Sequence, residues 1–163
     1  MLEKIIKTFG TILSCVCIFF LLGLFVSVLV GVATRYFLSN PSSWTEEVAR
    51  YFQVWLTFIG APLGFITLSH IGIRYLPEAL NPIYKFVLDL FINCIVIFVC
   101  FFMFFDGIKF TRFTWSDTLQ SLDVSMGMMS YLVVPISAVL ITIAIILNVI
   151  RSTKELRSRK GED

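Results

Sequence analysis

The sequence predicts an all-α integral membrane protein with four transmembrane helices, both termini in the cytoplasm and an interfacial start to the second helix. Hydrophobic residues make up 58% of the 163 residues, 17 residues are Phe, and the mean hydropathy is +0.90. A soluble domain of this length could not bury so much apolar surface. The net charge of +2 is small and its basic residues are scattered, so nucleic acid is not expected as a partner.

Long apolar runs define the expected helices. They span roughly residues 9–36, 46–69, 83–106 and 125–150, within a single membrane domain of residues 1–163 that ends in a basic cytoplasmic tail, 151–163. A helix crosses the hydrocarbon core with about 20 residues, and the runs are too long for barrel strands. The first run exceeds the apolar part of a signal peptide, about 7–15 residues, so we expect it to remain as an uncleaved span. The third gains length if Lys85 and Asp89 lie at the interface.

Local signals mark two helix starts. Ser43-Trp44-Thr45-Glu46 matches a capping box, in which Ser43 caps the helix and Glu46 reaches back to it. The second helix is therefore expected to begin near Trp44, before the membrane core. Asn81-Pro82 fits an N-cap followed by proline at the first helical position, and it opens the third span.

The basic residues set the expected orientation. An even number of spans puts both termini and the loop between spans two and three on one side. That side holds Lys4, Lys7, Arg74, Lys85, Arg151, Lys154, Arg157, Arg159 and Lys160. The other side holds Arg35, Arg50, Lys109 and Arg112. By the positive-inside rule, both termini are expected in the cytoplasm, with the chain crossing the membrane several times.

A charged cluster is expected where the second helix meets the outer face. Glu46 and Glu47 lie four and three residues before Arg50, so either carboxylate could reach its guanidinium. Arg35 ends the first span and should lie close by. The aromatic residues expected at an interface are Trp44, Tyr51 and Trp55. Two interpretations stay open here: an interfacial helix cap with an internal ion pair, or a contact with another chain.

Small residues recur at helical spacing and predict close helix packing. They are Gly23, Ser27 and Gly31 in the first helix, and Gly60 and Gly64 in the second, where Pro62 could kink the helix. Small side chains let helix backbones approach in lipid, where the hydrophobic driving force between helices is missing. The stripes could pack within this chain or against a partner helix, and the sequence does not separate the two.

No catalytic, cofactor or metal site is predicted, so we do not expect an enzyme. The chain has one histidine, His70, and its four cysteines lie in apolar runs without a zinc spacing. Asn93 is the most polar residue expected inside the third span, and a lone amide there usually joins helices. The alternative of a self-contained, small homo-oligomeric four-helix carrier needs a membrane-embedded carboxylate, which the first run lacks.

Several of these motifs together resemble a known family. The string SWTEEVARYF at residues 43–52, then WLTFIGA at 55–61 and HIGI at 70–73, is similar to the small membrane subunit of tripartite ATP-independent periplasmic (TRAP) transporters. Arg35-Tyr36 before the string and Ser130-Tyr131-Leu132 with Pro135 after it add to the similarity. Arg74 stands where the family often has Asp, which leaves that position without an assigned role.

The resemblance implies a division of labour between subunits. In such systems a periplasmic binding protein captures an organic acid, such as a C4-dicarboxylate or a sialic acid. A large multispanning membrane subunit then carries it inward with sodium ions. The small four-helix subunit would brace the large one within the membrane lipid and could help to dock the binding protein.

Overall fold

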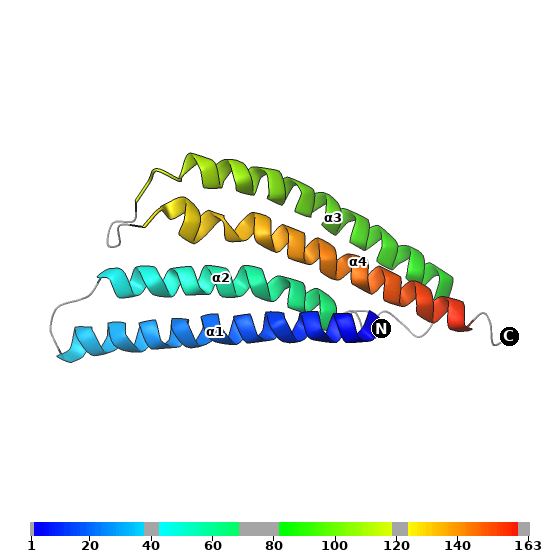
Figure 1. Ribbon diagram of the computed structural model, residues 1–163, viewed down its shortest axis with the longest axis horizontal. Helices are drawn as coiled ribbons and strands as arrows, with labels where there is room; N and C mark the ends of the chain where they lie inside the picture. The colour runs from blue at the N-terminus through cyan, green and yellow to red at the C-terminus, as the bar shows by residue number, and fades with distance from the viewer. Residues whose placement is uncertain (1, 38–42, 69–81, 119–123, 160–163) are drawn as a thin grey trace.

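The computed structural model describes residues 2–37, 43–68, 82–118 and 124–159, and nearly all of them are helical. Its elements are α1 (Leu2–Phe37), α2 (Ser43–Leu68), α3 (Pro82–Phe113), the short π-helix η1 (Gly127–Tyr131) and α4 (Val133–Arg159). Figure 1 shows them lengthwise, with the start of α1 and the end of α4 at the same end of the molecule. The prediction of an all-α chain is confirmed.

The helix boundaries differ from the expected spans in informative ways. α1 begins earlier than expected, and α3 continues past residue 106 to Phe113. Three segments are long and apolar enough to cross a membrane: Leu2–Phe37, Leu90–Phe113 and Gly127–Arg151. Among the residues that were described, α2 does not provide a fourth such segment. A fourth span through α2, like the cytoplasmic placement of the termini, therefore stays a prediction.

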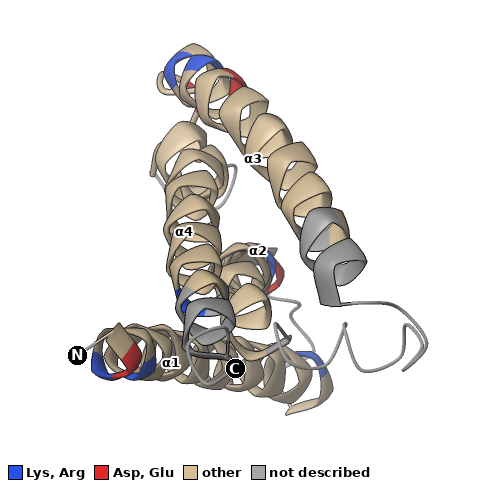
Figure 2. Cartoon of the chain, turned by 90° about the vertical axis from the view of Figure 1, so that its right-hand side faces the viewer, with Lys and Arg blue, Asp and Glu red and all other residues tan. Residues whose placement is uncertain are grey.

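The four long helices form a row. α1 packs along α2, α2 along α4, and α4 along α3, whereas the described parts of α3 contact neither α1 nor α2 through their backbones. Figure 2 shows that the row is not flat, because α3 and α1 run in different directions on either side of α4. The helices therefore do not surround a common interior.

The buried side chains gather around α4. One cluster joins α1, α2 and α4 and includes Leu13, Ile59 and Val133; a second joins α3 and α4 through Cys100 and Ile145. Val133 and Ala144 are completely buried. Because α4 contributes to both clusters, it is the helix that holds the two halves of the row together.

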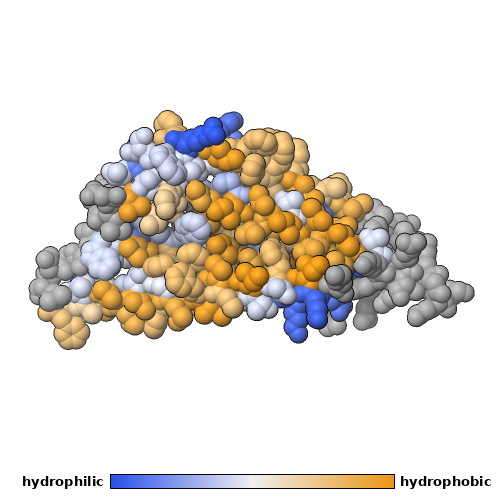
Figure 3. All heavy atoms as spheres, viewed as in Figure 1, coloured by the Kyte–Doolittle hydropathy of each residue, from blue (hydrophilic) through white to orange (hydrophobic). Residues whose placement is uncertain are grey.

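The outer faces of α1 and α3 are apolar and exposed. Their exposed aromatic residues include Phe19, Phe25, Phe91, Phe98, Phe101, Phe102 and Phe105. The charged residues lie toward the helix ends in Figure 2, and Figure 3 shows a broad apolar band across one face. A soluble monomer rarely exposes such a surface, so these faces are suited to lipid or to a membrane partner.

At one end α3 closely approaches both α4 and η1, through two glycines. A Cβ on Gly107 would lie 2.8 Å from Pro135 Cδ, and one on Gly127 would lie 2.5 Å from the carbonyl oxygen of Thr111. The Gly127 N–H donates to the Thr114 carbonyl at 3.1 Å, and the Ser125 hydroxyl donates to the Trp115 carbonyl at 2.8 Å. The end of α3 and the start of η1 are therefore held together by backbone contacts that leave no room for a side chain at Gly127.

Gly127→Ala tests this contact. The added methyl group would meet backbone rather than a movable side chain, so we expect the variant to lose about 1–3 kcal/mol of unfolding free energy. Gly10→Ala is the matched control, because its Cβ would meet only Ile66 Cγ2 at 3.8 Å. It should be neutral or stabilised by up to about 1 kcal/mol. Unfolding in detergent followed by circular dichroism measures both, and equal stabilities would contradict the close contact.

Candidate functional site

The charged cluster predicted from the sequence lies where α1 ends and α2 begins. Arg35 Nη2 donates to Glu46 Oε1 at 2.8 Å, and the two side chains are 63% and 67% exposed. Helical spacing predicted that either Glu46 or Glu47 could pair with Arg50 on the same helix. In the structure Glu46 of α2 instead pairs with Arg35 of α1, so this ion pair links the two helices. The capping role of Ser43 is not tested, because its side chain lies outside the described residues.

The backbones of α1 and α2 approach closely beneath this pair. Thr45 is 2% exposed, and its Oγ1 lies 3.0 Å from where a Cβ on Gly31 would be. Farther along, a Cβ on Gly23 would lie 2.8 Å from the Phe52 ring. Ser27, between the two glycines, is 8% exposed and donates to its own helix at Gly23 O, 2.8 Å away. The small-residue stripe of α1 thus lies beneath α2, within this chain.

The second predicted small-residue step is packed less tightly. A Cβ on Gly60 would lie 3.8 Å from Cys17 Sγ, an ordinary van der Waals distance, and Gly64 is half-buried. Pro62, between them, is completely buried. These positions allow contact between α1 and α2 but do not require glycine as strictly as Gly23 does.

The aromatic members of the cluster connect α2 to the start of α4. Phe20 stacks on Trp55 with ring centroids 5.5 Å apart and an interplanar angle of 26°. The Trp55 indole N–H donates to the Met129 carbonyl of η1 at 2.7 Å. The hydroxyl of Tyr51 is hydrogen-bonded to that of Ser130, also in η1. Tyr51 and Trp55 therefore face inward and hold the fold together.

The π-helix η1 is a junction between three helices. Besides its contacts with α2, Tyr131 stacks on Phe110 of α3, with centroids 6.0 Å apart and rings 21° from parallel. The Leu132 N–H donates to the Gly127 carbonyl at 3.0 Å, which is the wider turn of a π-helix. Such turns are often found at functional sites. Here the wider turn places the Met129 carbonyl and Ser130 against α2.

The remaining members of the cluster face outward. Trp44 is 44% exposed, Arg50 is exposed, and Glu46 and Arg35 are exposed although paired. Glu47 is half-buried. The predicted cluster is thus divided, with its aromatic residues at 51 and 55 inside and its charges at the surface.

The end of α3 adds a second polar and aromatic patch at the same end of the molecule. Asp106 Oδ1 and Lys109 Nζ are 3.6 Å apart and exposed. Phe113 and Trp115 are 81% and 53% exposed. Sequence reasoning missed this patch because it ended the third span at residue 106. The spacing of Lys109 and Arg112 on a continuing helix was the available signal.

The described residues give no indication of catalytic or metal chemistry. Within them, no three His, Cys, Asp or Glu side chains converge. Cys15 and Cys94 are exposed, Cys17 is half-buried and Cys100 is buried, and all are free thiols. The predictions at His70 and Arg74, and the side chains of Lys85 and Asp89, lie outside the described residues.

The fold and the surface define an integral membrane protein. Apolar helices of spanning length have their charges near the helix ends, and the apolar surface faces outward. Residues 24–155 match the family of Tripartite ATP-independent periplasmic transporters, DctQ component, and the chain belongs to this family. The match includes α2, α3, η1, the last part of α1 from residue 24 onward, and most of α4. The resemblance read from the sequence is therefore confirmed.

Individual relatives agree with the family. Over 107 residues the chain is 29% identical to the "Putative TRAP transporter small permease protein" of Haemophilus influenzae, covering 66% of each chain. Over 81 residues it is 30% identical to the "Sialic acid TRAP transporter small permease protein SiaQ" of Vibrio cholerae, covering 49% of this chain and 44% of that one. Less than two thirds of each relative is matched. Membership of the family makes the protein a component of a TRAP transport system in the inner membrane, and not an enzyme.

Packing, rather than charge, is expected to hold the α1–α2 junction. Exposed ion pairs contribute about 0.2–1 kcal/mol, so a double-mutant cycle with Arg35→Gln and Glu46→Gln should give a coupling in that range. Gly31→Leu should cost about 1–3 kcal/mol, because the side chain would overlap the buried Thr45. Unfolding in detergent at low and high salt measures both. A coupling energy larger than the loss of unfolding free energy in Gly31→Leu would contradict the expectation that packing contributes more than the ion pair.

The Trp55 hydrogen bond can be removed without removing its ring. Trp55→Phe leaves an aromatic ring against Phe20 but strands the Met129 carbonyl, so we expect a loss of about 1 kcal/mol in unfolding free energy. Trp44 is 44% exposed, so Trp44→Phe is the matched control and should change the free energy of unfolding little. Both variants are measured by unfolding in detergent. Equal losses of unfolding free energy in the two would show that the Trp55 hydrogen bond does not contribute to stability.

Proposed function

We propose that the chain is the small scaffold subunit of a sodium-coupled, binding-protein-dependent TRAP transporter. In this proposal it braces a large membrane subunit that carries organic acids, such as C4-dicarboxylates or sialic acid. The family membership supports the assignment to a TRAP system. The name of the Vibrio relative supports sialic acid as one candidate substrate.

The open row of helices is the observation that carries the scaffold role. A carrier needs polar or charged groups around a pathway near the membrane midplane. The row α1–α2–α4–α3 encloses no shared interior, and in the described residues the carboxylates lie near helix ends: Glu3, Glu46, Glu47, Asp106 and Asp117. A chain with exposed apolar edges and no internal pathway is better suited to support transport in another subunit.

The outward charges at the α1–α2 junction are the proposed contact with that subunit. Arg35, Glu46 and Arg50 are exposed, and Trp44 lies among them. The inward Tyr51 and Trp55 fix the helix that presents these charges, so their positions do not depend on the partner. The patch of Lys109, Phe113 and Trp115 lies at the same end, where a periplasmic binding protein could be docked.

Reconstitution separates this proposal from a self-contained homo-oligomeric carrier. The purified chain in proteoliposomes with a sodium gradient should take up no radiolabelled dicarboxylate or sialic acid. Uptake should appear only when the large subunit and the binding protein from the same operon are added. Sodium-driven uptake by the chain alone would overturn the scaffold role.

The surface charges can be tested in the same complete system. Arg50→Ala should reduce co-purification of the large subunit, and uptake with it, by about fivefold or more, the effect of losing roughly 1 kcal/mol or more at an interface. Lys4→Ala, an exposed basic residue at the opposite end, is the control and should leave both unchanged. If the two variants show equal co-purification and uptake, the charged cluster serves only as a helix cap and does not contact the large subunit.

A further inference from the structure

The exposed face of α3 changes from aromatic to charged at one point. Phe98, Phe102 and Phe105 are exposed on it, and Asp106 and Lys109 follow within the next turn. The two charged side chains are exposed as well, and their charged atoms are 3.6 Å apart. Charged groups that face hydrocarbon are costly and therefore rare. The hydrocarbon core of the bilayer is thus expected to end near Asp106.

The chain beyond α3 supports the same boundary. Residues 114–118 leave the helix, and all of them except Thr114 are exposed. Thr118 forms a bridge with Ser125, and the Met126 N–H donates to the Asp117 carbonyl at 2.8 Å. Exposed irregular backbone does not occur in hydrocarbon, because its N–H and C=O groups need water. The outer corner, which we define as residues 107–118 with η1, therefore belongs outside the core.

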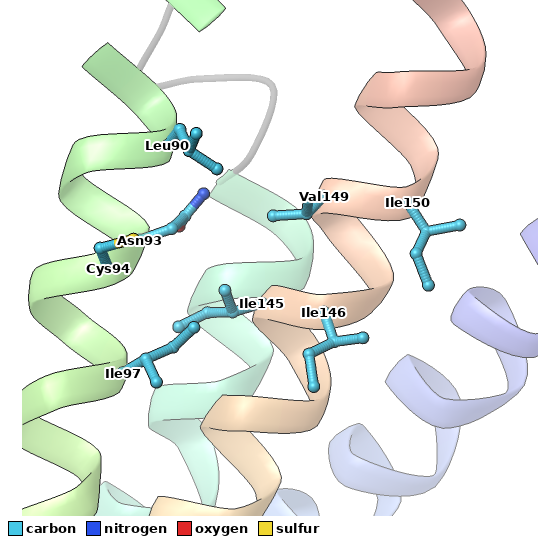
Figure 4. Close-up of a pocket in the computed structure, with 8 residues that line it drawn as sticks. All are labelled: Leu90, Asn93, Cys94, Ile97, Ile145, Ile146, Val149 and Ile150. Carbon is cyan, nitrogen blue, oxygen red and sulfur yellow. The ribbon is translucent and has the colours of Figure 1, made fainter. Parts of the chain in front are cut away.

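The uncharged part of α3 is short. It covers residues 90–105, between Asp89 and Asp106. Figure 4 shows its first turns, where Ile97 points toward α4 among other aliphatic side chains and Asn93 supplies an amide. At about 1.5 Å per residue this run is roughly 24 Å long, which is less than the roughly 30 Å of a typical hydrocarbon core. α3 therefore has no length to spare for a strong tilt.

The uncharged part of α1 is much longer. It covers residues 8–34, between Lys7 and Arg35. Apolar side chains are exposed along most of this length, from Ile12 to Val32. The run measures about 40 Å, so it fits a core of about 30 Å when the helix axis leans by roughly 40° from the membrane normal. In Figure 2, α1 and α3 run in different directions, as expected for one oblique and one upright helix.

We propose that the membrane boundary at the η1 end crosses α3 at Asp106 and α1 at Arg35, with α3 close to the membrane normal and α1 oblique. Both edges of the row then fit one bilayer, although their uncharged runs differ in length. The outer corner emerges from the core, which puts the exposed Trp115 at the level of the lipid headgroups, where Trp is favoured. This placement rests on charge and apolar length and does not depend on the transport role.

The alternative is a span through the whole apolar segment Leu90–Phe113, with its charges inside the core. Asp106 and Lys109 could then neutralise each other, but both side chains are exposed. Arg112, exposed on the next turn, has no carboxylate partner among the residues that the structure describes. Charges inside a membrane usually face the protein interior and are paired there. The exposed charges therefore favour the boundary at Asp106.

Reaction with a water-soluble maleimide tests the boundary on α3. The full-length chain is reconstituted in phosphatidylcholine vesicles, and the reagent is supplied on both sides. Cys15 and Cys94 are exposed but lie within the uncharged runs, so the wild type should react slowly. Phe113→Cys should react about tenfold faster or more, because the reactive thiolate forms in water and not in hydrocarbon. Phe98→Cys, which replaces another exposed Phe of α3, is the matched control and should react like the wild type. Equal rates in the two variants would overturn a boundary at Asp106.

The same reagent measures the tilt through the length of the unreactive run in each helix. Single cysteines are placed in turn at the exposed positions of α1 and α3. We expect the unreactive run to be about ten residues longer in α1 than in α3, because an oblique helix places more residues in the core. Runs of equal length would mean that both helices stand alike, and they would overturn the oblique placement of α1.

Spin labels at the two test positions give a measurement that does not depend on thiol reactivity. Oxygen concentrates in the hydrocarbon core, whereas a polar nickel complex stays in water. Collisions with oxygen should prevail for the label at Phe98→Cys, and collisions with the nickel complex should prevail for the label at Phe113→Cys. Prevailing oxygen collisions at both positions would place the outer corner inside the core and would overturn the proposal.

Discussion

The position of α4 between α2 and α3 is the constraint on which the rest of the structure depends. α1 joins the row mainly through α2, and α3 joins it through α4 and the adjoining η1. Without α4 and η1, the described backbones of α1 and α2 would make no contact with that of α3. The completely buried residues Val133, Ser137 and Ala144 show how fully α4 is enclosed. In lipid this enclosure gains little from the hydrophobic effect, so close packing and a few hydrogen bonds must supply it.

The glycines show how much of this packing the sequence could reveal. Gly23 and Gly31 lie on one helix, and their spacing predicted a face for close packing; the structure places α2 on that face. Gly107 and Gly127 are as tightly packed, yet they lie on different elements, so no helical period connects them. The fold class and approximate helix ranges followed from the apolar runs alone. The order of the helices in the row did not, because similar apolar faces give no sign of which face meets which.

The sequence predicted that the charged residues gather at the start of α2, but not which of them form an ion pair. Helical spacing brings both Glu46 and Glu47 within reach of Arg50, so pairs within α2 were predicted. The structure pairs Glu46 with Arg35, a contact that requires the two helix ends to be brought together first. Gly31 and Thr45 do this by close backbone packing, which local sequence rules do not describe. In the same way, Tyr51 and Trp55 resembled interfacial aromatics, but the turn of η1 gives Trp55 an acceptor at the Met129 carbonyl and places Ser130 beside Tyr51.

An open row has consequences for any partner. Its two edges, α1 and α3, are separated by α2 and α4, so one subunit lying against one edge leaves the other edge in contact with lipid. The apolar surface of both edges is therefore consistent with a subunit that widens a membrane-anchored assembly on one side.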